Sequence, residues 1–153
     1  MSIHNSNRIK LGTTHKWLSY LIWLVVAISG VVYTFRQDYL LVEPDSTSVN
    51  ILKIHGLFAA VTLIIFGSII GTHIHSAWQR KRNVVTGVLI FSMFSIVSLS
   101  GYALYYSPEE WHEFAKWTHI YSGILTILIL PAHIAIGRFL QRQRIKLHRK
   151  HQN

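Results

Sequence analysis

Four long apolar stretches occupy most of this 153-residue chain, and they constrain its fold more than any other feature. They cover about 15–36, 51–78, 84–106 and 115–140. Each is close to the roughly 20 residues that a helix needs to cross the hydrocarbon core of a bilayer. The connections between them are short, which leaves no room for a separate soluble domain. We therefore predict an all-α membrane protein, a four-transmembrane-helix bundle in which residues 1–153 form one domain.

The composition agrees with a membrane class and excludes several kinds of site. Half of the residues are apolar and 14% are charged, as expected of a chain that lies largely in lipid. The sequence contains no cysteine. Disulfides, iron–sulfur clusters and covalently attached c-type haem are therefore excluded.

The distribution of charge predicts the orientation. Twelve of the 15 basic residues lie before or at the start of the first stretch, between the second and third, or at or after the end of the fourth, and all six acidic residues lie at the opposite ends. By the positive-inside rule, both termini are expected in the cytoplasm, and the protein is expected to be multi-pass in the inner (cytoplasmic) membrane of the cell. The net charge of +9 then reflects topology and contact with membrane lipid, and we expect no nucleic-acid partner.

Four histidines lie near the ends of these stretches at two depths. His15 and His133 are near the cytoplasmic side, and His55 and His119 are near the outer side. His119 and His133 are fourteen residues apart, which places them about 21 Å apart along one helix and about 40° apart around it. Histidines inside a bilayer are costly and usually functional. Two depth-matched pairs are typical of bis-His ligands to two haems, and their saturated iron favours electron transfer.

His73 is an alternative to His15 as the partner of His133. It follows His55 by eighteen residues, which is five helical turns, so the two share a helix face. It would, however, lie about one turn, or about 6 Å, too far toward the cytoplasmic side. His73 and His75 could instead line a quinone or proton site. His112, in the outer acidic loop, is expected to be exposed.

Glycines follow two of the histidines by one helical turn. Gly123 follows His119 by four residues, and Gly137 follows His133 by four. They could leave space for the flat face of a porphyrin, or they could serve ordinary close packing of membrane helices. Gly30 and Gly101 allow the same two interpretations.

The chain resembles the small four-helix di-haem cytochromes b of bacterial membranes. This family includes the cytochrome b-561 type and the cytochrome b subunits of formate dehydrogenases and Ni-Fe hydrogenases. The resemblance covers all four stretches and rests on His15-Lys16-Trp17, Ser29-Gly30, His55, His119 and His133. The region 82–138, with Thr86-Gly87 and Ser100-Gly101-Tyr102, is also similar to a loosely characterised group of four-span cytochrome b-like proteins.

The resemblance implies two haems b, one held by His15 and His133 and the other by His55 and His119. Lys16 and Arg138 are candidates for binding the haem propionates at the cytoplasmic side. The implied function is relay of electrons across the bilayer between a quinone or quinol pool and a redox partner. The partner would be a periplasmic redox protein or a catalytic subunit, and the chain itself would be an electron-transfer subunit or a small quinone-linked oxidoreductase. The alternative is a histidine-lined transporter of protons or a divalent metal, without haem.

Overall fold

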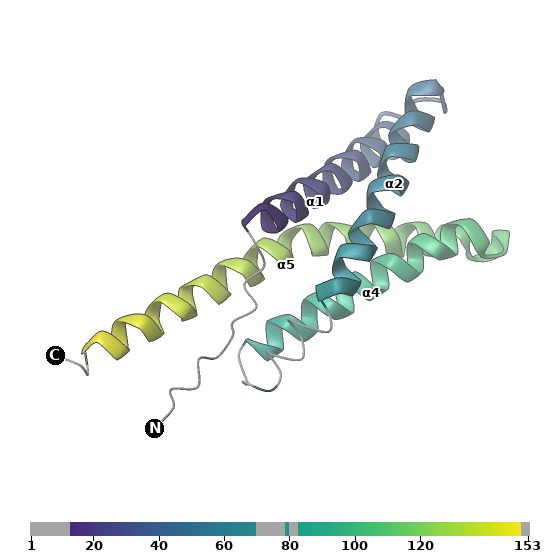
Figure 1. Cartoon of the computed structure of the whole chain (residues 1–153). Helices are drawn as coiled ribbons and strands as arrows, with labels where there is room; N and C mark the ends of the chain where they lie inside the picture. Colours follow the sequence, from purple (N-terminus) through teal and green to yellow (C-terminus); the bar gives the residue numbers. More distant parts are fainter. Residues whose placement is uncertain (1–12, 70–78, 80–82, 151–153) are drawn as a thin grey trace. The chain divides into compact units, whose positions relative to one another are not determined.

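The regular structure of the chain is helical. The computed structural model describes residues 13–69, 79 and 83–150, and it describes their side chains except at 13–15, 69, 144 and 148–150. Its elements are α1 (Thr13–Thr34), a short π-helix η1 (Phe35–Tyr39), α2 (Ser46–Ile69), α4 (Val84–Tyr106) and α5 (Glu109–Lys150) (Figure 1). No strand occurs within the described ranges. The predicted all-α fold class is therefore confirmed.

Among the described residues, four helical segments are long and apolar enough to cross a membrane. They are Lys16–Tyr39, Ser46–Ser68, Val84–Tyr106 and Glu109–Leu147. Many of their large apolar side chains are exposed; Ile64 is 74% and Leu99 69% exposed, for example. Because a lipid environment solvates such side chains as a protein core would, this exposure fits helices that lie in a bilayer. The multi-pass membrane character predicted from the sequence is thus present in the structure.

The helices form two compact units, each a helical hairpin. Unit 1 falls within Met1–Ser76 and contains α1, η1 and α2, whereas unit 2 falls within Ala77–Asn153 and contains α4 and α5. In each unit the two long helices pack against each other (Figure 1). Each hairpin can therefore be described by itself.

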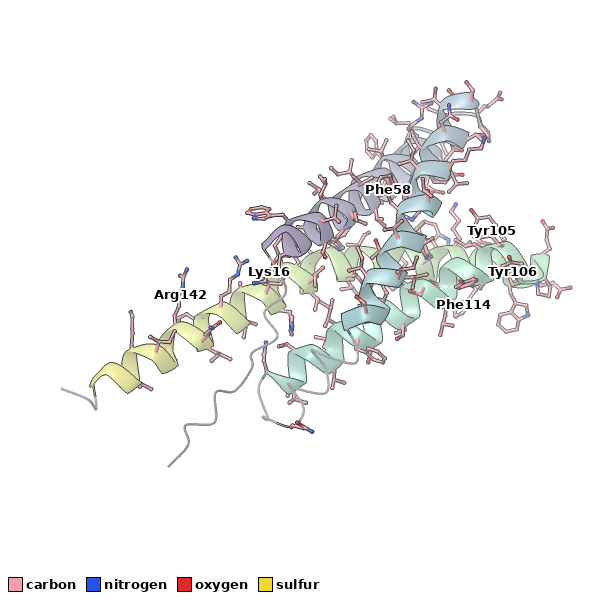
Figure 2. All side chains as sticks on the ribbon, in the orientation of Figure 1. Lys16, Phe58, Tyr105, Tyr106, Phe114 and Arg142 are labelled. Carbon is pink, nitrogen blue, oxygen red and sulfur yellow. The ribbon has the colours of Figure 1, made fainter. Side chains whose placement is uncertain are left out.

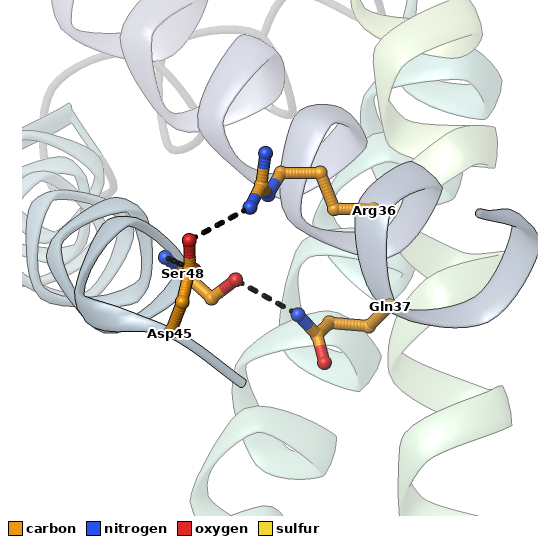
Figure 3. Close-up of polar contacts among 4 residues, drawn as sticks. All are labelled: Arg36, Gln37, Asp45 and Ser48. Carbon is orange, nitrogen blue, oxygen red and sulfur yellow. Dashed lines mark hydrogen bonds and ion pairs between the residues drawn. The ribbon is translucent and has the colours of Figure 1, made fainter. Parts of the chain in front are cut away.

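The turn of unit 1 is fixed by polar contacts between the end of α1 and the start of α2. Asp45 caps α2, because its Oδ1 accepts the backbone N–H of Ser48 at 2.8 Å. The Arg36 guanidinium donates to Oδ2 of Asp45 at 3.1 Å, and the Gln37 amide donates to Oγ of Ser48 at 2.9 Å (Figure 3). These bonds join η1 to the first turn of α2. They therefore set the position at which α2 starts to return along α1.

Unit 2 turns through two residues and packs through small side chains. α4 ends at Tyr106, and the carbonyl of Pro108 accepts the N–H of Trp111 as α5 begins. The buried side chains of α5 are Ala115, Ser122 and Thr126. Ser122 and Thr126 donate their hydroxyls to carbonyls one turn earlier in α5, at 2.6 and 2.7 Å. Small, internally bonded residues let two membrane helices approach closely.

α5 extends beyond the predicted fourth stretch at both ends. It spans 42 residues, which corresponds to about 63 Å, whereas the prediction was 115–140. Hydropathy detects only the apolar part of a helix. The charged ends of α5 are also stable as helix, because Glu109 and Glu110 interact favourably with its positive N-terminal end and the basic residues with its negative C-terminal end. Figure 2 shows Tyr105, Tyr106 and Phe114 near the turn of unit 2 and Arg142 on the part of α5 beyond α4.

The other predicted stretches agree with the helices to different degrees. The third, 84–106, coincides with α4. The first, 15–36, corresponds to α1. The π-helix η1 follows α1 directly and ends at Tyr39. The second, 51–78, corresponds to α2, which begins earlier, at Ser46, because Asp45 provides its cap. Residues 70–78 of that prediction lie outside the described residues.

Candidate functional site

In unit 1, His55 of α2 is hydrogen-bonded to the backbone of α1. Its Nδ1 lies 3.0 Å from the carbonyl oxygen of Val26 and 3.2 Å from Oγ of Ser29. The Ser29 hydroxyl is itself directed to α1 carbonyls, with Val25 the nearer acceptor at 2.7 Å. Its oxygen can therefore accept from the ring. The imidazole is only partly exposed and is clamped between the two helices of the hairpin.

In unit 2, His119 of α5 makes the same contacts with α4. Its Nδ1 lies 2.9 Å from the carbonyl oxygen of Val97 and 3.3 Å from Oγ of Ser100. Ser100 donates to Val97 in the same way that Ser29 donates to Val26. In both hairpins the carbonyl acceptor belongs to the residue three positions before the serine. The two histidines thus have the same pair of acceptors.

These contacts determine which ring nitrogen carries the proton. A backbone carbonyl oxygen can only accept a hydrogen bond, so Nδ1 of His55 and of His119 must carry the proton and donate. In a neutral imidazole the other nitrogen, Nε2, then has the lone pair that can bind a metal. Metal-binding histidines commonly donate their second ring N–H to a carbonyl or carboxylate, which fixes the ring and raises its basicity. Both histidines are arranged in this way.

A glycine follows each of the two serines and lies against the histidine ring. A Cβ added at Gly30 would lie 2.9 Å from Cε1 of His55, and one added at Gly101 would lie 3.2 Å from Cε1 of His119. Both distances are shorter than ordinary van der Waals contact, so any larger residue would push on the ring. The Ser-Gly pair therefore provides a hydrogen-bond acceptor together with the space that the imidazole occupies.

His133 of α5 has a related but different setting in unit 2. Its Nδ1 lies 2.9 Å from Oγ1 of Thr86, and a Cβ added at Gly87 would lie 3.9 Å from its Cε1. The Thr86 hydroxyl donates to Oδ1 of Asn83 at 2.6 Å, so its oxygen is the acceptor for the ring N–H. The Nδ1 of His133 thus contacts a side-chain hydroxyl, and Thr86-Gly87 follows the same Thr/Ser-Gly pattern.

The two hairpins are structural repeats of each other. Valine, serine and glycine occur at matching positions of α1 and α4, and a histidine followed seven residues later by a threonine occurs in α2 and α5. Thr62 and Thr126 each donate to the carbonyl four residues earlier. The residue fourteen positions before the serine is His15 in unit 1 and Thr86 in unit 2. The residue fourteen positions after the histidine is Ile69 in unit 1 and His133 in unit 2.

The remaining predicted residues fall in several places. His15 lies in α1, but its side chain is not described, and His73 and His75 lie outside the described residues. Lys16 and Arg138 are exposed on α1 and α5. His112 is exposed, as predicted, and its Nε2 lies 3.2 Å from the carbonyl oxygen of Leu104.

The glycines Gly123 and Gly137 lie on the side of α5 that packs against α4. An added Cβ would meet Cγ2 of Val97 at 3.8 Å in the first case and Nδ2 of Asn83 at 3.7 Å in the second. Both distances are ordinary van der Waals separations. The contacts agree with a helix-packing role, and a role beside a porphyrin remains a prediction for both.

Sequence reasoning identified the histidines but missed the main-chain acceptors of Val26 and Val97. A backbone carbonyl has no residue signature, so only the register between two helices can reveal it. The signal that was available was the repeat itself, because Ser-Gly precedes the histidine-bearing helix in both halves of the chain.

No family, curated protein or solved structure matched this chain in comparisons with known proteins. Within the described part of the chain, no three His, Cys, Asp or Glu side chains are grouped as a protein-only metal site. The functional argument therefore rests on the residues and their contacts.

Proposed function

We propose that this protein is a membrane-embedded di-haem b electron-transfer protein of the inner membrane. In this proposal its four spans form one bundle with both termini in the cytoplasm. The observation that supports it most strongly is the matched setting of His55 and His119. Each imidazole donates from Nδ1 to a main-chain carbonyl and has a glycine against its ring.

This setting suits an axial ligand of haem iron. A haem b in this protein would be held by two imidazoles. The two ligands therefore need the same tautomer and a fixed ring orientation, and they have to come from two different helices. His55 and His119 meet the first two requirements through their Ser-Gly partners and the third through their positions in α2 and α5. We assign them as the two ligands of one haem.

The internal repeat supports His15 and His133 as the second pair. In unit 2, Thr86 and His133 are in direct contact and so lie at one level of the hairpin. The matching positions in unit 1 are His15 and Ile69, and this match supports a corresponding level for His15 within its own hairpin. His73 is four residues beyond Ile69, or about 6 Å further along the helix. His15 is therefore the better partner for His133.

The chemistry of the bound groups defines the activity. Haem b would supply reversible one-electron transfer, and two axial histidines leave its iron without an open position. The chain binds and orients the two groups and keeps water from them by its apolar helices. Lys16 begins its span and Arg138 lies in the C-terminal part of its own, and both would neutralise haem propionates. Electrons would pass between a quinone or quinol pool and a redox partner.

Single histidine variants of the purified protein test the assignment. We expect His55→Ala and His119→Ala each to lose one haem, and His15→Ala and His133→Ala each to lose the other. His112→Ala is the matched control, since it removes an exposed imidazole, and it should keep two. Haem quantified per chain gives the result. Loss of haem that does not follow these two pairs would contradict the ligand assignment.

A further inference from the structure

The three described histidines of the spans differ in the kind of acceptor that their Nδ1–H groups contact. His55 and His119 donate to main-chain carbonyls, at 3.0 and 2.9 Å, with a serine oxygen as a second acceptor. Nδ1 of His133 lies 2.9 Å from a threonine hydroxyl. An amide carbonyl is a stronger hydrogen-bond acceptor than a neutral hydroxyl. The imidazoles of the first pair are therefore the stronger electron donors.

The donor strength of an axial imidazole affects the reduction potential of the iron that it binds. Hydrogen bonding from Nδ1–H gives the ring more anionic character, which stabilises ferric over ferrous iron and lowers the potential. The acceptor of the His133 Nδ1–H therefore affects the iron that His133 would hold: removing this acceptor should make that iron easier to reduce.

We infer that Thr86 is the residue through which this chain tunes the reduction potential of the haem on His133. This inference rests on the di-haem function proposed above. Thr86 is a positioning residue, because it acts through His133 and does not itself bind iron. Ser29 and Ser100 should tune their haem much less, because the carbonyls of Val26 and Val97 remain when either serine is replaced.

The geometry around Thr86 supports this role. Its hydroxyl connects Asn83, the residue immediately before α4, to the ring on α5, through contacts of 2.6 and 2.9 Å. The hydroxyl is thus held in place from one side and receives the imidazole proton on the other. Replacing Thr86 with valine keeps the β-branched shape and removes both hydrogen bonds.

The experiment is a redox titration of the purified protein in detergent, with haem absorbance as the readout. His119→Ala and His133→Ala each leave one haem, which assigns the two midpoint potentials in the parent protein. In the parent background, we expect Thr86→Val to raise the potential of the His133 haem. The reduced-to-oxidised ratio at fixed potential should change about tenfold, which is about 59 mV for a one-electron couple. Thr86→Ser should restore the parent potential.

Controls and contrary outcomes separate the inference from the function on which it rests. Ser29→Ala, Ser100→Ala and Thr126→Val should each shift the potentials far less than Thr86→Val. Thr126 is a buried threonine of the same unit whose hydroxyl donates within α5. Two bound haems with no shift in Thr86→Val, or equal shifts in the serine variants, would overturn the inference and leave the proposed function standing. Absence of haem from the parent protein would overturn both. If Thr86→Val does not fold, Thr86→Ala also removes the hydroxyl and should raise the same potential.

Discussion

An imidazole that donates its Nδ1 proton to a carbonyl on a neighbouring helix is fixed in both orientation and tautomer. His55 and His119 are both held in this way, by Val26 and Val97. The glycine beside each ring is as important as the acceptor, because it leaves the volume that the ring fills. At the scale of single residues, the candidate site therefore consists of a histidine, a serine, a glycine and a main-chain carbonyl.

Replacing the glycines with alanine should disturb the histidines. In Gly30→Ala the new Cβ would lie 2.9 Å from the His55 ring, and in Gly101→Ala it would lie 3.2 Å from the His119 ring. We expect Gly30→Ala to have the larger effect, with about a tenfold or greater loss of haem affinity, as is common when the support of a metal ligand is changed. Haem titration of the purified variants measures this.

Gly67→Ala provides the control for the glycine variants. A Cβ added at Gly67 meets nothing within 4 Å in this structure, and alanine is the better helix former. This variant should bind haem like the parent protein. Equal affinity losses in Gly67→Ala and Gly30→Ala would show that the close contact with His55 is not the cause.

The sequence predicted the histidines of the candidate site better than their partners. His55, His119 and His133 were identified by spacing and depth alone, since a polar side chain in an apolar stretch is conspicuous. The contact between Thr86 and His133 joins residues 47 apart in the chain, and spacing within one helix cannot reveal such a pair. For Gly30 and Gly101 the sequence allowed either space beside a porphyrin or helix packing, and it did not reveal their contact with the histidine rings.

At the scale of elements, the start of α2 depends on one carboxylate. The Asp45 carboxylate accepts hydrogen bonds from the backbone N–H and the side chain of Ser48. These bonds, together with the nearby Arg36 guanidinium, lower the pKa of Asp45 to about 2. Because this pKa is depressed, the carboxylate stabilises the fold at pH values above its ordinary value of 3.8 and loses this effect as the pH falls toward about 2. The effect is modest for an exposed group.

Two substitutions at Asp45 separate its charge from its capping role. We expect Asp45→Asn to keep the cap, since asparagine is an equally good N-cap residue, and to reduce the loss of thermal stability between pH 4 and pH 2. Asp45→Ala should lower stability at neutral pH as well. Thermal unfolding in detergent as a function of pH measures both. An Asp45→Asn variant as acid-sensitive as the parent protein would contradict the assignment.

The sequence predicted that the four apolar stretches form helices, but it predicted the residues at which those helices begin and end less well. Hydropathy located α4 at its observed bounds because turn-forming residues flank an uncharged run. It missed the polar ends of α5, because the helix begins at Glu109 and ends at Lys150, outside the apolar stretch at both ends. It also missed η1, because the contacts of Arg36 and Gln37 with the start of α2 are made only once the hairpin forms.

At the scale of the whole molecule, the proposed topology can be tested with the chain's lack of cysteine. Single cysteines can be placed in the parent sequence without other thiols. Leu41 lies between η1 and α2 and is 79% exposed, and Lys146 is exposed near the end of α5. With both termini in the cytoplasm, a membrane-impermeant thiol reagent should label Leu41→Cys in intact spheroplasts. It should label Lys146→Cys only after permeabilisation. The opposite pattern would reverse the orientation.

The most direct test of the di-haem proposal is the haem content of the purified parent protein. We predict two haems b per chain, with low-spin bands in the spectrum of the dithionite-reduced minus the oxidised protein, because four histidines can supply two axial ligands to each iron. A protein purified intact from haem-replete cells that contains no haem would contradict the proposal, and its histidines would then require an explanation in proton or metal transport.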